Sequence, residues 1–347
     1  MMAPISGWKR HMTGQIRLSP AQARKLIFKA LTGAGTSETN ARYFTGAILD
    51  TELSGLSGHG FYWLPYYCEH VQSGKVDGKA RPAVKRISAS AFRVDARQGF
   101  AHPAIEKGFE KLIPAALKNG IAGLAVHNSY NAATLGYHTG YLARHGLLAF
   151  GFTNSPAKIA PAGGKSAVIG TNPLSFAVPG KGGKIAFLID QSSSAVAWTR
   201  VKRAADAGES IPLGWALDPE GQPTTDPLLG LAGTMAPSGG YKGFGQGLIV
   251  EVMCAALTGS NSGLQMGSLS ENDGKPVGNG QFFIALEPNV FSGGMFHKQI
   301  ATLVKSITAQ EGARMPNARR EANYKRLKRE GLLIDKALHD RIQSFAR

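Results

Sequence analysis

The chain has 347 residues and is 43% hydrophobic, so it is long enough for two or three domains and too apolar to be disordered throughout. It has no run of about 18 apolar residues, which excludes a membrane-spanning helix, and its first residues are too polar for a secretory leader. The two cysteines, Cys68 and Cys254, are too few for a disulfide scaffold, and we expect a cytoplasmic protein. The formal net charge of +16 favours anionic small molecules over nucleic acid as partners, because no zinc-finger spacing or aromatic-interleaved basic pattern accompanies it.

Two helices are predicted near the N-terminus. Ser19 can cap the first, and Pro20 suits its first turn because the missing N–H costs nothing there. The second helix begins near Ser37 and carries a buried stripe that includes Phe44. It runs into a turn in which His59 lies between two glycines.

His59 has little side-chain cover from its neighbours, so its imidazole is predicted to be accessible. An exposed turn histidine without a function is the alternative interpretation. The aromatic residues at 61–67 suit the wall of a pocket or a subunit contact. Cys68, Glu69 and His70 follow, but neighbours on one helical turn point in different directions and no second cluster completes four ligands, so no metal is assigned.

The middle of the chain reads as an α/β unit. Residues 84–94 form a predicted strand region, and residues 104–117 form a helix. Apolar runs of strand length at 121–126 and 147–152 flank another helix at 134–145. Polar residues follow both strands, and we expect them at the carboxyl ends of neighbouring strands, where open α/β sheets place ligands.

Three later segments suit an anionic ligand. Glycines, a lysine and short hydroxyls between 161 and 173 let backbone amides approach an anion, although a surface loop of turn residues is the alternative. A strand at 184–189 ends in Asp190, which can bind ribose hydroxyls or cap a helix. Glycines and a lysine at 238–245 begin a helix, where free amides and the helix dipole favour negative charge.

The glycine spacing excludes the standard nucleotide-binding motifs. No G-x-G-x-x-G follows a strand, and the P-loop-like end at Gly164-Lys165-Ser166 has Ile159 where a P-loop requires its first glycine. A G-x-S-x-G nucleophile elbow is also absent. Residues 214–226 are rich in turn signals and are expected to form a long ordered loop. From the residues alone, the chain is a small-molecule α/β enzyme.

A series of motifs resembles the type-2 malate/L-lactate dehydrogenase family over nearly the whole chain. They are G-H-G at 58–60, N-S-x-N at 128–131, T-N-S followed by A-P-x-G-G and G-T-N-P at 153–173, D-Q-S-S-S at 190–194, D-P-E-G-Q-P-T-T-D-P at 218–227 and G-G-Y-K-G-F-G at 239–245. The resemblance implies the α/β fold of that family, in which a non-Rossmann nucleotide-binding domain joins a helical domain built from both chain ends. We expect residues 15–85 with 300–347 to form the helical, dimerisation domain and residues 86–299 to bind NAD or NADP.

The resemblance also implies a homodimer that binds a nicotinamide dinucleotide and a small anionic substrate. Abundant arginine and lysine favour NADP over NAD, because they suit a 2′-phosphate. The family's proton donor falls on His59, a role that suits a group titrating near neutrality. The matching cofactor positions are Asn131, Ala132, Ala133, Thr134, Leu135, Asp190, Gln191, Ser192, Tyr241, Lys242, Arg314 and Asn317. The matching substrate positions are Trp63, Thr171, Ser193 and Ser194.

Three positions depart from the family pattern. Gly58 stands where a serine usually precedes the histidine, with Ser57 one place earlier as the nearest catalytic hydroxyl, and Asn131 replaces a family histidine. Trp63 replaces an arginine that often clamps the substrate carboxylate. A buried carboxylate without a partner is costly, so we expect another cation to bind it. The candidates by position are Lys158, Lys165 and Arg200.

Three functions are consistent with these features. The first is an NAD(P)-dependent oxidoreductase that interconverts a small 2-oxo acid and 2-hydroxy acid, like malate, lactate or 3-sulfolactate, by hydride transfer with His59 as proton donor. The second is an NADPH-dependent reductase of the cyclic imino acids Δ1-piperideine-2-carboxylate or Δ1-pyrroline-2-carboxylate. The third is a non-catalytic basic binding protein on the same scaffold, which salt-sensitive DNA binding without turnover would indicate.

Overall fold

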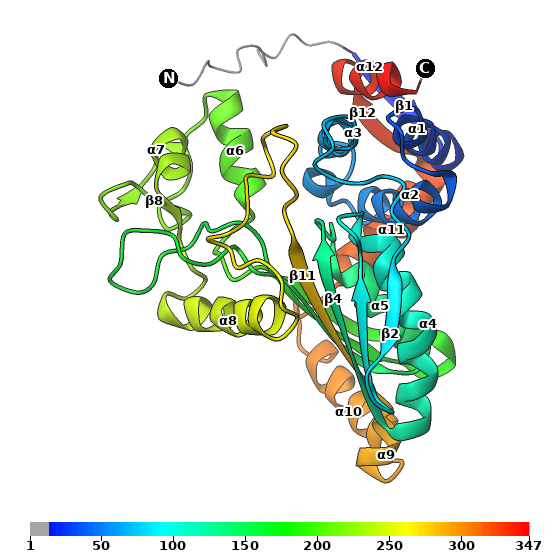
Figure 1. The fold of residues 1–347 in the computed structure, drawn as a ribbon. Helices are drawn as coiled ribbons and strands as arrows, with labels where there is room; N and C mark the ends of the chain where they lie inside the picture. The colour runs from blue at the N-terminus through cyan, green and yellow to red at the C-terminus, as the bar shows by residue number, and fades with distance from the viewer. Residues whose placement is uncertain (1–13, 347) are drawn as a thin grey trace.

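The computed structural model describes residues 14–346, in which a seven-stranded sheet carries a helical domain at one end and a small third region beside it (Figure 1). The strand order is β2-β3-β4-β11-β5-β6-β7, and only β3 and β4 are parallel neighbours. The strands are β2 (Ala83–Arg86), β3 (Ala91–Asp95), β4 (Ile121–Ser129), β5 (Leu148–Thr153), β6 (Leu174–Pro179), β7 (Ile185–Gln191) and β11 (Asn279–Leu286).

β11 separates the two strands that sequence patterns predicted as neighbours. The runs at 121–126 and 147–152 are present as β4 and β5, but the prediction that they are neighbouring strands was wrong, because β11 lies between them. β11 is antiparallel to both, so β4 and β5 run in the same direction. Their carboxyl ends therefore still lie at one edge of the sheet, as expected for a ligand site.

Two helices cover one face of the sheet, and a third lies against the other. Ile105 and Leu112 of α4 pack on Leu124 of β4 in one buried cluster, and each such side chain contributes about 1.5–3 kcal/mol by leaving water. On the opposite face Phe152 packs with Val250 of α8. The helices around the sheet are α4 (Ala101–Asn119), α5 (Leu135–Arg144), α8 (Tyr241–Glu251), its π-helical continuation η3 (Val252–Ala256), α9 (Pro288–Ser292) and α10 (Phe296–Thr308), with the short 3-10 turn η2 (Lys181–Gly183) before β7.

The helical domain joins the two ends of the chain, as the resemblance implied. Ser19 caps α1 in a capping box with Gln22, and Ser37 caps α2, as predicted. Strands β1 and β12 pair antiparallel, and α1 packs against α12, which brings blue and red ribbon together in Figure 1. The elements are β1 (Gln15–Leu18), α1 (Pro20–Gly33), α2 (Glu38–Leu53), the 3-10 turn η1 (Ser57–His59), α3 (Leu64–Gln72), α11 (Ala318–Glu330), β12 (Leu332–Asp335) and α12 (Lys336–Phe345). α10, which begins before residue 300, lies instead with α9 at the far end of the sheet.

Residues 214–226, which were predicted to form a loop, contain two short strands that belong to the third region. β8 and β9 form a hairpin there, because the side chain of Asp218 accepts the amide of Gln222 across the turn at 2.8 Å and Ala216 is fully buried. The elements of the third region are α6 (Trp198–Ala207), β8 (Ala216–Leu217), β9 (Pro223–Thr224), α7 (Pro227–Ala232) and β10 (Thr234–Met235). In the part of the chain described by the structure, no helix is long and apolar enough to cross a membrane.

Candidate active site

His59 ends the short turn η1, between α2 and α3. Its amide donates to the carbonyl of Leu56 at 2.8 Å, and its ring is half-buried rather than fully accessible. Burial lowers the pKa of His59 below its usual value, Asp190 opposes this change, and Arg320 adds to it. The imidazole therefore loses its proton more readily than a free histidine, and it lies in the field of an acidic and a basic side chain.

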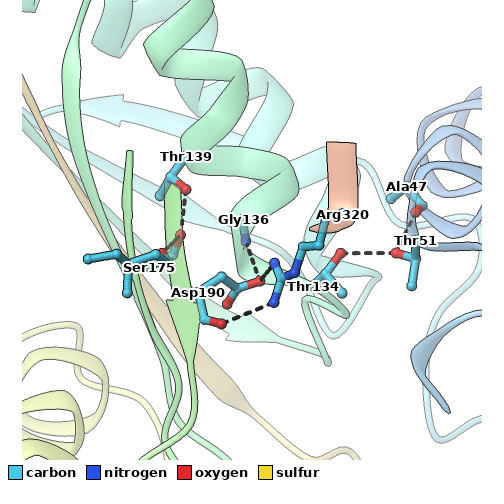
Figure 2. Close-up of polar contacts among 9 residues, drawn as sticks. Ala47, Thr51, Thr134, Gly136, Thr139, Ser175, Asp190 and Arg320 are labelled. Carbon is cyan, nitrogen blue, oxygen red and sulfur yellow. Dashed lines mark hydrogen bonds and ion pairs between the residues drawn. The ribbon is translucent and has the colours of Figure 1, made fainter. Parts of the chain in front are cut away.

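Asp190 lies near the end of β7, where two other elements meet it (Figure 2). Its Oδ2 accepts the amide of Gly136, near the start of α5, at 3.1 Å and pairs with Nη1 of Arg320, on α11, at 3.0 Å. A second guanidinium nitrogen, Nη2, donates to the Asp190 carbonyl at 3.1 Å. The structure thus brings the predicted acid residue at a strand end close to His59, together with an arginine that sequence reasoning missed.

The segment that begins α5 is ordered by its own polar groups. The side-chain oxygen of Asn131 accepts the Ala133 amide at 2.6 Å, and Ala133 has a positive φ of 53°. Thr134 is the N-cap of α5, but its hydroxyl makes no cap bond and pairs instead with Thr51 of α2 at 2.9 Å (Figure 2). Ala132 and Leu135, also predicted at the cofactor, are buried. Helix amides without a side-chain cap at this edge suit a phosphate or ribose group.

The three serines that follow β7, at 192–194, hydrogen-bond within and around their own loop. The hydroxyl of Ser193, which is fully buried, donates to the Asn172 carbonyl at 3.0 Å, and that of Ser194 donates to the Val196 carbonyl at 2.6 Å. Ser192 pairs with Ser194 at 3.0 Å, and Gln191 is exposed. The amide of Thr171 donates to Ser155 at 3.1 Å. The two serines predicted to bind substrate use their hydroxyls to shape the backbone in this structure.

Trp63 lies among aromatic rings, and Lys158, one of the candidate cations, lies over a different tryptophan. Trp63 is 8% exposed and packs against Tyr66, with ring centroids 4.9 Å apart. The ammonium of Lys158 lies 5.5 Å from the centroid of the Trp198 ring, and burial lowers its pKa. Trp198 packs against the cores of both the helical domain and the third region, so Lys158 lies where the two meet.

The remaining predicted cofactor residues lie at helix starts. Tyr241 and Lys242 begin α8, whose N-cap Gly240 has a positive φ of 67° and no side-chain cap. A Cβ on Gly239 or Gly240 would meet nothing within 4 Å, so the backbone there is open to a ligand. Asn317 is the N-cap of α11, and Arg314 is exposed. Within residues 14–346 no hydrogen bond joins Tyr241, Lys242 or Arg314 to Asp190.

Glu52 is a second residue that sequence reasoning missed. It is 5% exposed, and its Oε1 accepts the amide of Phe61 at 2.5 Å, just after His59 in the chain. A Cβ on Gly60 would lie 2.1 Å from that oxygen, so glycine is required there. Burial raises the pKa of Glu52 to about 7. The sequence does indicate that Glu52 is buried, because it continues the i, i+4 spacing of Phe44 and Ile48 on the buried stripe of α2.

In the part of the chain that the structure describes, neither a metal cluster nor the groove between α1 and α2 marks the site. Within residues 14–346 no group of three or more His, Cys, Asp or Glu side chains could hold a metal ion. An open groove of about 460 Å³ lies between α1 and α2, and none of the predicted site residues lines it. The convergence of His59, Asp190 and the α5 start therefore defines the candidate site, because it brings a titratable group and free amides to the sheet edge.

An acid at a strand end, a histidine on an adjoining turn and uncapped helix starts nearby are an arrangement that suits an oxidoreductase that binds a dinucleotide. Residues 18–343 match the model of the malate/L-lactate dehydrogenase family, and the chain belongs to that family. The predictions of family, fold and enzyme class are confirmed.

Named relatives fall into two groups. The chain is 40% identical to the (2R)-3-sulfolactate dehydrogenase (NADP(+)) of Chromohalobacter salexigens, covering 95% of this chain and 98% of that enzyme. It is 37% identical to the Delta(1)-pyrroline-2-carboxylate reductase of Ancylobacter novellus, covering 96% and 98%. The solved delta1-piperideine-2-carboxylate reductase of Pseudomonas syringae superposes with a TM-score of 0.89 at 32% identity, covering 95% of this chain and 99% of that one.

Proposed function

We propose that this chain catalyses the NADP-dependent interconversion of a small 2-oxo acid and its 2-hydroxy acid, with His59 as proton donor. The observation that carries the proposal is the convergence of His59, Asp190 and Arg320 at the sheet edge where α5 begins. The name of the Chromohalobacter relative supports an anionic 2-hydroxy acid such as 3-sulfolactate and NADP as cofactor.

The open, uncapped start of α8 suits the phosphates of the dinucleotide, with Lys242 as counter-charge, and Asp190 suits a ribose. When bound, NADPH supplies a hydride to the carbonyl carbon. His59 gives a proton to the oxygen that becomes negative, and in the reverse direction the neutral ring accepts the hydroxyl proton. We infer that Lys158 pairs with the substrate carboxylate in place of the arginine missing at Trp63.

The second candidate is the reduction of a cyclic imino acid. It is favoured by relatives named as Delta(1)-pyrroline-2-carboxylate reductases, which are 37% and 34% identical to this chain. The same His59 would give its proton to the amine nitrogen, so the mechanism alone does not separate the two substrates.

A substrate panel separates these functions. Oxaloacetate, pyruvate, sulfopyruvate and Δ1-pyrroline-2-carboxylate are offered with NADPH or NADH, and the nicotinamide absorbance is followed. Turnover of a 2-oxo acid supports the first function, and turnover of the imino acid alone supports the second. No turnover, no thermal stabilisation by either dinucleotide and salt-sensitive DNA binding would support the non-catalytic alternative.

We also propose that the protein is a cytoplasmic homodimer that buries the outer surfaces of α8 to α10. Large apolar side chains are exposed there, including Ile249 at 58%, Phe291 at 64% and Leu303 at 47%, and α10 has no buried residue. A surface of this kind fits a second copy of the chain. Light scattering on the purified protein should give twice the chain mass, and Ile249→Lys with Leu303→Lys should give monomers. Leu213→Lys, at an exposed site in the third region, is the control, and a monomeric wild type refutes the proposal.

A further inference from the structure

Gly58, the residue directly before His59, faces helix α6 and has no side chain on that side. A Cβ on Gly58 would lie 3.3 Å from Oγ1 of Thr199 and 3.9 Å from its Cβ. The first distance is slightly shorter than ordinary van der Waals contact, so Thr199 lies directly against the position that a side chain at 58 would enter and would have to shift slightly to admit one. Its hydroxyl therefore stands close to the place that a hydroxyl on residue 58 would occupy.

Thr199 is well placed to hold the turn that carries His59. It is 7% exposed, and Val201, two residues further along α6, is buried in the core of the third region. A β-branched side chain has few rotamers, so its hydroxyl direction is restricted. Within residues 14–346 this hydroxyl makes no hydrogen bond, whereas Ser57, on the turn itself, is exposed.

We propose that Thr199 is the positioning residue for His59, supplying from α6 the hydroxyl that the turn lacks at Gly58. The proposal rests on the proposed function of His59 as proton donor. A histidine that transfers a proton needs a fixed ring orientation and tautomer, and a hydroxyl that can both donate and accept can fix them. Because Thr199 and His59 belong to different regions, the proton donor is ordered only when these regions are packed together.

Three single variants test this, with the imidazole of His59 followed by NMR titration and turnover followed on the substrate panel. Thr199→Val keeps the shape and removes the hydroxyl, and it should lower kcat about 10- to 100-fold while leaving dinucleotide affinity unchanged. It should also change the resonances and titration midpoint of the His59 ring. Thr199→Ser should retain wild-type values. Thr234→Val removes a buried, unpaired hydroxyl elsewhere in the third region and should change neither readout.

An exchange variant makes the test specific to this contact. Gly58 does not have a positive φ, so its backbone accepts a serine. Thr199→Gly alone should lose activity, and Gly58→Ser with Thr199→Gly should recover most of it, because the hydroxyl returns from the other side.

The proposal is overturned if Thr199→Val leaves both kcat and the His59 titration unchanged, or if Ser57→Ala costs more activity than Thr199→Val. If the wild type turns over no substrate of the panel, the proposed function fails. The NMR titration of the same variants then still decides whether Thr199 positions the ring.

Discussion

The guanidinium group of Arg320 holds Asp190 twice, through the side-chain oxygen at 3.0 Å and through the backbone carbonyl at 3.1 Å. Arg320 comes from the C-terminal helix α11, whereas Asp190 lies near the end of β7. The pair therefore ties the helical domain to the edge of the sheet (Figure 2), and both of its charges act on the pKa of His59. Such a two-point, charge-assisted contact fixes both partners.

Removing this arginine should change the titration of His59. Arg320 lowers the pKa of His59 and Asp190 raises it, so Arg320→Ala should raise that pKa and move the pH profile of reduction to higher pH. The loss of the partly buried pair should also cost about 1–3 kcal/mol of stability. Both effects are measured by pH–rate profiles and urea unfolding. Arg319→Ala, at an exposed neighbour on α11, should change neither, and an unmoved profile in Arg320→Ala would contradict the assignment.

Replacement of the proton donor should separate chemistry from binding. His59→Asn removes the transferable proton, and we expect kcat for reduction to fall by roughly 10²- to 10⁴-fold. Dinucleotide affinity should persist, because His59 is not among the residues proposed to bind the dinucleotide, which lie at the starts of α5, α8 and α11 and at the end of β7. Stopped-flow turnover and a dinucleotide titration measure the two effects. His145→Asn, at an exposed position after α5, serves as control, and full turnover by His59→Asn would refute the mechanism.

The wild-type enzyme should show opposite pH dependence in the two directions. Reduction needs the protonated ring, and burial lowers the pKa of His59 below 6.5, so kcat/KM for reduction should fall as pH rises through this value. Oxidation needs the neutral ring and should be lost as pH falls through it. Initial rates between pH 5 and 9 in both directions check this. A reduction rate that stays constant across that range would be inconsistent with His59 as donor.

Lys158 should set the affinity for the substrate carboxylate. Lys158→Ala should raise KM for the 2-oxo acid by about tenfold or more, because a charged hydrogen bond contributes roughly 1.5–3 kcal/mol. The dinucleotide KM should remain unchanged. Steady-state kinetics on the preferred substrate measure both constants. Lys184→Ala, at an exposed site before β7, is the charge-matched control, and equal effects of the two variants would point to general electrostatics.

Glu52 should make stability depend on pH. Its pKa is raised from 4.5 to about 7, so the folded chain holds this proton more tightly than the unfolded chain. The free energy of unfolding should therefore fall as pH rises from about 4.5 to about 7, by roughly 3 kcal/mol from this group. Urea unfolding at several pH values measures the slope, and Glu52→Gln should remove this part of it. A variant with the wild-type slope would show that Glu52 does not titrate in this range.

Local patterns were sufficient for most elements and for the family. The starts of α1 and α2 follow from Ser19 and Ser37, because capping involves only neighbouring residues. Each motif of the resemblance is contiguous in the chain, so the family could be recognised without a structure.

Only the tertiary structure decided which distant residues meet. No sequence pattern placed β11 between β4 and β5, Arg320 on Asp190, or Thr199 against Gly58. The physical reason is that periodicity and capping report interactions within a few residues, while pairing between segments far apart depends on the packing of the whole chain. The sequence by itself therefore determined the kind of enzyme, and the fold decided which side chains surround its proton donor.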